Sequence, residues 1–174
     1  PGLVGQVEIR GPSVVVSYWA PAGSDPPERP ATDPHGWLST GDLGWVDGDG
    51  YVWLVGRVDD VINRGGEKIY PREIEEVLLA EPEVAEAAVV GRPDPLVGEV
   101  PVAFVRPRAA ADDPVGLDPV GVDPAGLAAR LAARCQRELS RRRRPVDIVV
   151  TDELPTGTNG KIRRSELRRA LAPE

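Results

Sequence analysis

Residues 65–80, GGEKIYPREIEEVLLA, predict a turn, a short strand and a helix in immediate succession. The two glycines supply the turn, and residues 67–69 follow as a strand. Pro71 stands where a first-turn proline belongs, and the helix is expected to run from there to about Ala80. This helix carries an apolar stripe at i, i+3 and i+4, formed by Ile74, Val77 and Leu78.

Strand-like segments flank this stretch on both sides. A short strand is expected at residues 60–63. The two most strand-like runs of the chain are residues 84–90 and 100–105, separated by a turn near Asp94-Pro95. The resulting order of strand, helix, strand and strand indicates an α+β packing unit.

The first part of the chain is expected to be rich in β-structure. Residues 4–10 alternate apolar and polar side chains like a strand, and a proline-rich connection follows at residues 21–34. Residues 43–47 and 51–55 predict a hairpin, because the DGDG turn between them supplies the positive φ angles that such a turn requires. The acidic turn lacks the ligand pattern of an EF-hand, so no calcium site is expected there.

Three near-copies of a pentapeptide occupy residues 113–127, and their regular Pro and Gly predict a surface loop for the first two copies. The third copy opens a helix that ends near Ser140, with Asp123 as its N-cap and Pro124 in its first turn. The arginine run 141–144 then either compensates the negative end of the helix dipole in solvent or contacts an anionic ligand or partner. Three further segments are expected: a strand at 146–150, a loop at 155–160 and a short amphipathic helix at 165–171.

Composition and charge narrow the class of protein. The 174 residues carry a net charge of −7, which argues against a nucleic-acid binder. No apolar run approaches the ~18 residues of a membrane span, and no signal peptide opens the chain, so a cytoplasmic protein is expected. Because the sequence contains no Met and begins at Pro1-Gly2, it is expected to be a piece of a longer protein.

The single Cys and the single His exclude a disulfide framework and a Cys/His zinc site, and no metal site is expected. His35, in the stretch DPHG, is expected to be a loop residue. Cys135 is expected to be a buried structural thiol, because it lies at helical spacing with Leu127, Leu131 and Leu139.

Only two of the 21 basic residues are lysine, Lys68 and Lys161, and both closely follow glycine. In a chain so rich in arginine, these positions are candidates for chemistry that needs a compact and mobile ammonium group. Gly160-Lys161 does not fit a phosphate-binding P-loop, because Gly157 lies too close and Ile162 follows the lysine. Spacing alone leaves Lys161 open to two interpretations, ligand contact or an exposed surface lysine.

Two charged pairs are further candidates. Asp42 and Arg57 flank the predicted hairpin. They either pair with each other or bind a polyol, with Asp42 accepting hydrogen bonds from hydroxyl groups and Arg57 donating them. Asp59 and Asp60 place like charges side by side, and they are expected to point to opposite faces of a solvated turn.

Four ordered stretches of the chain resemble motifs of the adenylate-forming enzymes, the superfamily of acyl-CoA synthetases, adenylation domains and luciferases. They are WLSTGDLG (37–44), GRVDDVI (56–62), GGEKIYP (65–71) with EIE (73–75), and ELP (153–155) with NGKI (159–162). The resemblance spans nearly the whole chain, with the motifs in family order. The GGEK form is most similar to acyl-CoA ligases.

This resemblance implies a reaction in two steps that uses ATP, Mg²⁺ and CoA. A carboxylic acid attacks ATP to give an acyl adenylate and pyrophosphate, and the thiol of CoA then takes the acyl group. The resemblance implies that Lys161 contacts the carboxylate and the α-phosphate during adenylation, where a positioned cation stabilises developing charge. It also implies that Asp42 binds the ribose hydroxyls of ATP and that Arg57 assists there.

The same resemblance implies that the chain is mobile between the two steps. Asp59 would be the hinge of a small domain that rotates between the half-reactions, and Gly66 and Lys68 would lie on the face that meets the pantetheine thiol donor. Residues 1–57 would end a large N-terminal domain and carry the ribose-binding motif. Residues 58–174 would form the small α+β domain with the hinge, the thiol-face loop and the catalytic lysine loop.

Two alternatives stand beside this interpretation. The acyl acceptor could be the phosphopantetheine of a carrier protein, which the arginine run 141–144 could meet if the carrier is acidic. The chain could also be a non-catalytic interaction module that keeps the motifs as scaffold. The family's Gly-rich phosphate loop and most of its acyl pocket, which lie upstream in the family, are missing here, so the chain alone is expected not to turn over.

Overall fold

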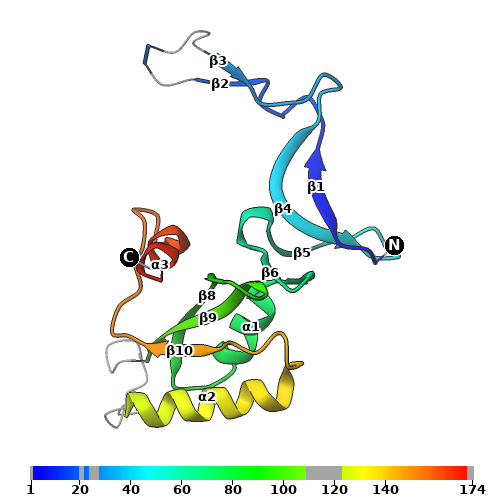
Figure 1. Cartoon of the computed structure of the whole chain (residues 1–174). Coiled ribbons are helices and arrows are strands. Elements are labelled where there is room, and N and C mark those ends of the chain that lie inside the picture. Colours follow the sequence, from blue (N-terminus) through cyan, green and yellow to red (C-terminus); the bar gives the residue numbers. More distant parts are fainter. Residues whose placement is uncertain (1, 20–21, 24–27, 109–122, 172–174) are drawn as a thin grey trace. The chain divides into compact units, whose positions relative to one another are not determined.

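The computed structural model describes residues 2–19, 22–23, 28–108 and 123–171 of the chain (Figure 1). The chain divides into two compact units, unit 1 from Pro1 to Asp59 and unit 2 from Asp60 to Glu174. The first two copies of the pentapeptide repeat lie outside the described residues. Across the described ranges, no helix combines the length and apolar character needed to cross a membrane.

Unit 1 contains a three-stranded antiparallel sheet in the order β1, β4, β5 (Figure 1). Its strands are β1 (Gly5–Ile9), β4 (Leu38–Val46) and β5 (Val52–Arg57). The predicted first strand and the predicted hairpin are confirmed. β4 begins earlier than the expected residue 43, because its first residues pair with Glu8 and Ile9 of β1.

Unit 1 also contains a two-stranded ribbon that the sequence pattern did not indicate. β2 (Ser17–Trp19) pairs antiparallel with β3 (Glu28–Pro30), so part of the expected proline-rich connection is a strand. Strands of three residues are too short to show the apolar and polar alternation that marks a strand in sequence.

The turn of the β4–β5 hairpin is organised by Asp47. Its Oδ1 accepts hydrogen bonds from the backbone N–H groups of Asp49 and Tyr51 at 3.0 and 2.9 Å, and its Oδ2 accepts one from the indole of Trp53 at 2.7 Å. The Trp53 bond above all, with those from the backbone, lowers the pKa of the Asp47 carboxyl. Trp53 also stacks on Trp45, with ring centroids 6.0 Å apart.

Unit 2 is built on a mixed sheet whose long central pair is β8 and β9. β10 runs parallel to β9, and the small β6–β7 hairpin joins the start of β9 through Arg64 and Gly98. The strand bounds are β6 (Ile62–Arg64), β7 (Glu67–Ile69), β8 (Val84–Asp94), β9 (Gly98–Pro107) and β10 (Asp147–Val150). The two strand-like runs and the turn between them are confirmed, although both strands are longer than expected.

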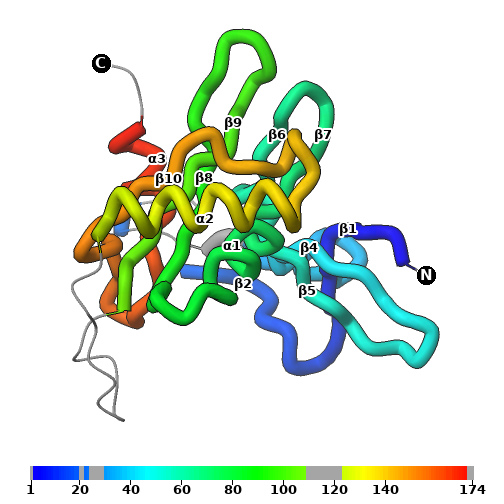
Figure 2. Tube along the Cα trace, turned by 90° about the horizontal axis from the view of Figure 1, so that it is seen from below, coloured from blue at the N-terminus to red at the C-terminus, as the bar shows by residue number. Residues whose placement is uncertain are grey.

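Each face of this sheet buries its own core, because successive residues of a strand point to opposite faces. α1 (Pro71–Leu79) and α2 (Pro124–Glu138) cover one face, where Ile74, Leu78, Leu127, Leu131 and Cys135 pack on alternate residues of β8 and β9 (Figures 1 and 2). α3 (Arg164–Ala170) and the segment that precedes it cover the other face, with Leu154 and Leu167 in a second core. The Lys161 segment therefore lies on the sheet face opposite to α1 and α2.

The helices of unit 2 begin as the sequence predicts. Pro71 opens α1, and Asp123 caps α2 by accepting hydrogen bonds from the N–H groups of Ala125 and Gly126 at 3.1 and 3.0 Å. Cys135 is buried in α2 as expected, and burial raises the pKa of its thiol.

The segment before β6 differs from the expectation. Residues 58–60 form a single 3₁₀ turn, η1 (Val58–Asp60), and β6 starts only at Ile62, so the predicted strand over 60–63 is wrong in its first half. Asp60 is not a solvated turn residue either, because its side chain is only 17% exposed and lies 2.7 Å from Arg168 Nη2. The partner is remote in sequence, so no local pattern could show it.

Candidate functional site

Asp42 and Arg57 stand opposite each other in the register of β4 and β5. Arg57 Nη1 lies 3.0 Å from Asp42 Oδ1 and donates to the carbonyl oxygen of Thr40 at 3.1 Å. The two side chains are 52% and 30% exposed, so the pair is open to solvent. Of the two interpretations that the sequence allowed, the structure contains the mutual ion pair. A carboxylate has lone pairs for further donors, so the pairing leaves room for a hydroxyl ligand.

The backbone around Gly41 determines how Asp42 and Arg57 are placed. Gly41 has φ +74°, which side chains disfavour, and a Cβ placed there would lie 2.8 Å from Arg57 Nη2. The Thr40 hydroxyl donates to the Val7 carbonyl at 2.9 Å and accepts from the Asp42 N–H at 3.1 Å. The sequence pattern indicated Asp42 and Arg57 but not the supporting roles of Thr40 and Gly41. The Thr-Gly pair directly before Asp42 was the feature that could have indicated those roles.

Gly65 and Gly66 form the two-residue turn of the β6–β7 hairpin, with φ +55° and +83°. Two positive φ angles are typical of a type I′ turn, which favours glycine. The Gly65 N–H donates to the Val97 carbonyl at 2.7 Å and so ties the turn to the β8–β9 loop. Lys68 follows on β7 with its side chain exposed, while its neighbour Ile69 is fully buried. The structure therefore presents Gly66 and Lys68 together at one accessible hairpin.

The arginine run lies beside this hairpin. Arg143 is 2.8 Å from Glu73 and 3.4 Å from Glu67, and Arg144 donates to two carbonyl oxygens at the end of α2. Arg144 therefore compensates the helix end, as the first interpretation of the run expected. Arg143 is engaged with carboxylates of unit 2, and Arg142, whose side chain is 67% exposed, lies 3.8 Å from the carboxylate of Glu67.

Lys161 lies in a loop that a β-bridge between Thr156 and Ile162 closes. Inside the loop, the Gly157 N–H donates to the Lys161 carbonyl at 2.8 Å. Leu154 and Ile162 pack into the core on the α3 face and anchor the loop on both sides. The Lys161 side chain itself is exposed. These contacts fix the backbone of Lys161, while its ammonium group remains exposed.

The two lysines belong to different parts of unit 2. Lys68 is on the β6–β7 hairpin, which joins the start of β9, and Lys161 is in the loop before α3. Figures 1 and 2 show the β6–β7 hairpin and α3 on different sides of the β8–β9 pair. Asp59, the expected hinge, is exposed in η1 as the last residue of unit 1.

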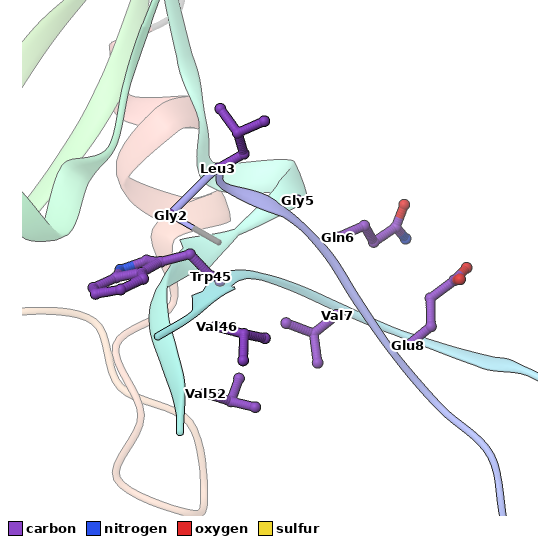
Figure 3. Close-up of a pocket in the computed structure, with 10 residues that line it drawn as sticks. Gly2, Leu3, Gly5, Gln6, Val7, Glu8, Trp45, Val46 and Val52 are labelled. Atoms are coloured by element: carbon purple, nitrogen blue, oxygen red, sulfur yellow. The ribbon is translucent and has the colours of Figure 1, made fainter. Parts of the chain in front are cut away.

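A separate concavity of about 380 Å³ lies beside β1 in unit 1 (Figure 3). Its lining is mainly apolar and includes Leu3, Val7, Trp45, Val46 and Val52. None of the site residues predicted from sequence lines it. In the part of the chain that the structure describes, no three His, Cys, Asp or Glu side chains gather in a way that could hold a metal ion.

Comparison with known proteins places the chain in a family. The family model of the AMP-binding enzyme C-terminal domain matches residues 73–161, just over half of the chain. A sulfoacetate–CoA ligase of Cupriavidus necator is 42% identical over 168 residues, which are 95% of this chain and 30% of that protein. The chain thus spans about 30% of the length of this curated relative.

Solved structures agree with this match. The anthranilate CoA ligase AuaEII in complex with anthranoyl-AMP superposes with a TM-score of 0.79 at 34% identity, over 98% of this chain and 30% of that one. The o-succinylbenzoate CoA synthetase of Bacillus subtilis, in complex with ATP and magnesium, gives a TM-score of 0.72 at 34% identity, over 98% of this chain and 31% of that one. The expected α+β fold is confirmed. The chain belongs to the adenylate-forming enzyme superfamily and represents the C-terminal portion of such an enzyme.

Proposed function

We propose that the chain is the C-terminal part of an acyl-CoA ligase that activates a carboxylic acid with ATP and transfers the acyl group to CoA. In the first step a carboxylate oxygen bonds to the α-phosphorus of ATP, and the bond from that phosphorus to pyrophosphate breaks. In the second step the CoA sulfur bonds to the acyl carbon, and AMP leaves. The observation that carries this proposal is the exposed Lys161 on a loop anchored at both ends.

Asp42 and Arg57 are the proposed contacts to the ribose of ATP. The Asp42 carboxylate is partly exposed and keeps lone pairs beyond its bond to Arg57, so it can accept hydrogen bonds from ribose hydroxyls. Arg57 holds that carboxylate in place and has further N–H groups to donate. The neighbouring Gly41 keeps this surface free of a side chain.

Lys161 is the proposed catalytic residue of adenylation. Negative charge accumulates on the α-phosphate and on the attacking carboxylate as the new bond forms. A lysine ammonium at this point neutralises that charge, and a positioned cation of this kind contributes roughly 10²-fold or more to the rate. The loop bonds around Lys161 reduce the reorganisation needed to place it.

Gly66 and Lys68 are the proposed thiol-side residues of the second step. A Cβ on Gly66 would meet no atom within 4 Å, so the turn presents bare backbone to an approaching pantetheine arm. Lys68 on the β6–β7 hairpin and Lys161 in the loop before α3 belong to different parts of unit 2, so we propose that one small domain presents different surfaces in turn. Asp59 is the proposed hinge for that movement.

Magnesium is proposed to arrive with ATP rather than to reside in this chain. Mg²⁺ is commonly bound by one or two carboxylates together with the phosphates of its nucleotide. The chain spans about 30% of the length of its curated relative, so we propose that the chain alone does not turn over.

Carboxylate-dependent exchange of pyrophosphate into ATP tests the proposal in the full-length protein. A small panel of aliphatic, aromatic and dicarboxylic acids is compared between the natural protein and Lys161→Ala. Exchange with at least one acid that falls about 10²-fold in the variant supports the proposal. Absence of exchange with every acid, or equal exchange in the variant, favours the non-catalytic interaction module instead.

The acyl acceptor is proposed to be CoA because the similar proteins are CoA ligases. A carrier protein is tested by supplying acyl acceptors of both kinds to the same enzyme. Acyl transfer to CoA at low micromolar concentration supports the proposal. Transfer only to a phosphopantetheinylated carrier, weakened by salt and by Arg142→Glu, would assign the alternative.

A further inference from the structure

Four charged side chains of unit 2 form one connected cluster, which we call the Asp60 cluster: Asp60, Glu75, Arg164 and Arg168. Asp60 Oδ1 lies 2.7 Å from Arg168 Nη2, and Asp60 Oδ2 lies 3.7 Å from Arg164 Nη1. Arg164 Nη2 also donates to both carboxylate oxygens of Glu75, at 2.7 and 3.0 Å. The cluster joins the first residue of unit 2 to α1 and to α3.

The two carboxylates of the cluster are more buried than those of the exposed surface ion pairs. The side chains of Asp60 and Glu75 are 17% and 10% exposed, and those of Arg164 and Arg168 are 28% and 34% exposed. In the exposed pair of Arg72 with Glu76 on α1, the corresponding fractions are 58% and 62%. Charges screened less by water interact more strongly, and two carboxylates balance two guanidinium groups here. Loss of one member therefore leaves a partly buried charge with one partner fewer.

Glu75 links the two faces of the sheet at the edge that β8 forms. Its Oε1 accepts a hydrogen bond from the Val89 N–H of β8 at 2.8 Å, while Val89 pairs with Ala103 of β9 on the inner side. The same carboxylate reaches Arg164 of α3, which packs on the opposite face. One side chain of α1 thus satisfies an edge N–H of the sheet and also fixes the helix on the far side.

α3 in turn fixes the Lys161 loop. Arg164 opens α3 three positions after Lys161, and the Arg163 N–H donates to the Pro155 carbonyl at 2.8 Å. Ile162 and Leu167 pack into the same core. A shift of α3 therefore moves the backbone of Lys161 directly.

We propose that the Asp60 cluster positions Lys161 for adenylation, with Asp60 and Arg168 as positioning residues that do not touch the substrate. The inference rests on the proposed function of Lys161. Asp60 directly follows the proposed hinge residue Asp59, so the cluster ties the Lys161 loop to the point from which the domain turns. Domain movement then delivers Lys161 as part of one rigid body.

The test measures the two half-reactions separately in the full-length protein. Arg168→Gln is expected to lower kcat for pyrophosphate exchange about tenfold or more, because misplacement by about 1 Å can cost up to 10²-fold. KM for ATP is expected to change little, since Asp42 and Arg57 are untouched. Thioester formation from supplied acyl adenylate, which does not need Lys161, is expected to stay within about twofold of the natural rate.

Three further variants separate positioning from simple loss of stability. Arg168→Lys keeps the charge and is expected to recover part of the exchange rate. The loss of exchange in Asp60→Asn combined with Arg168→Gln is expected to be smaller than the two single losses added together, because the two side chains share a contact of 2.7 Å. Arg130→Gln removes the exposed pair with Glu83 and serves as the control with unchanged exchange.

The outcomes distinguish this inference from the proposed function. If the natural protein shows no exchange with any acid, the proposed function fails and the inference fails with it. If the natural protein exchanges but Arg168→Gln lowers both half-reactions equally, or lowers only the melting temperature, the inference alone is overturned. Selective loss of exchange supports both.

Amide hydrogen exchange gives a second measurement that does not depend on activity. In Arg168→Gln, the amides of residues 157–163 are expected to lose protection while those of β8 and β9 keep it. Unchanged protection of the loop would show that the cluster does not hold it and would overturn the inference, whatever the variant does to the rate.

Discussion

Arg57 and Asp42 form an ion pair across the ladder of β4 and β5, with Arg57 Nη1 3.0 Å from Asp42 Oδ1. The pair is partly exposed, so it contributes little to stability. The pair fixes the direction of the Asp42 carboxylate. The Thr40 hydroxyl accepts a hydrogen bond from the Asp42 N–H and so also fixes the backbone at this residue. The pair is therefore expected to affect nucleotide binding more than stability.

Asp42→Asn is expected to raise KM for ATP about tenfold, because an amide is a weaker acceptor for ribose hydroxyls than a carboxylate. The free energy of unfolding is expected to change by less than about 0.5 kcal/mol. Steady-state kinetics and urea unfolding of the full-length protein measure the two effects. Asp49→Asn in the exposed hairpin turn is the matched control. An unchanged KM for ATP would contradict the proposed contact of Asp42 with the ribose.

Gly41→Ala is expected to disturb the same site through the backbone. The φ of +74° strains any side chain, and the new Cβ would displace the Arg57 guanidinium from its place 2.8 Å away. Unfolding is expected to become easier by about 1–3 kcal/mol, together with weaker ATP binding. Gly48→Ala is the control, because a Cβ there meets nothing within 4 Å and its φ is not positive. Equal effects of the two substitutions would refute this explanation.

Cys135 is expected to react slowly with thiol reagents in the folded protein, because burial raises the pKa of its thiol above the ordinary value of 9.0. At pH 8 the native protein is expected to react on the order of 10²-fold more slowly than the urea-unfolded protein. Equal rates in the two states would contradict burial of the thiol.

The same shift predicts the sign of a pH effect on stability. A raised pKa means that the folded state favours the protonated thiol of Cys135. The contribution of this thiol to the free energy of unfolding is therefore fully present below pH 9.0 and is lost as the pH rises beyond it. Cys135→Ala is expected to flatten this part of the stability profile.

Local patterns predicted most elements of unit 2. The apolar stripe of α1, the cap at Asp123 and the long apolar runs of β8 and β9 each have a signal within a few residues of sequence. The ends of β8 and β9 were less clear, because Pro93 and Gly98 are typical of turns. Both nevertheless pair within the ladder, where a neighbouring strand supplies the ordering that their own preferences do not.

Contacts between remote residues could not be predicted. The Asp60–Arg168 pair joins positions 108 residues apart, and the Arg143–Glu73 pair joins positions 70 apart. Charge on an isolated residue does not identify its partner, so Asp60 resembled a turn residue and the arginine run resembled a solvated helix end. The candidate site residues, in contrast, do have local signals in the sequence. Lys68 and Lys161 were singled out by their rarity and by the glycines before them, and the family motifs supplied their proposed roles.

The most direct measurement compares Lys161→Ala and Lys68→Ala in the two half-reactions of the full-length protein. Pyrophosphate exchange reports adenylation, and release of AMP from supplied acyl adenylate in the presence of CoA reports thioester formation. We predict that Lys161→Ala loses exchange about 10²-fold and keeps thioester formation, whereas Lys68→Ala keeps exchange and slows thioester formation. Equal loss of both half-reactions in either variant, or no loss in both variants, would contradict the assignment of one lysine to each step.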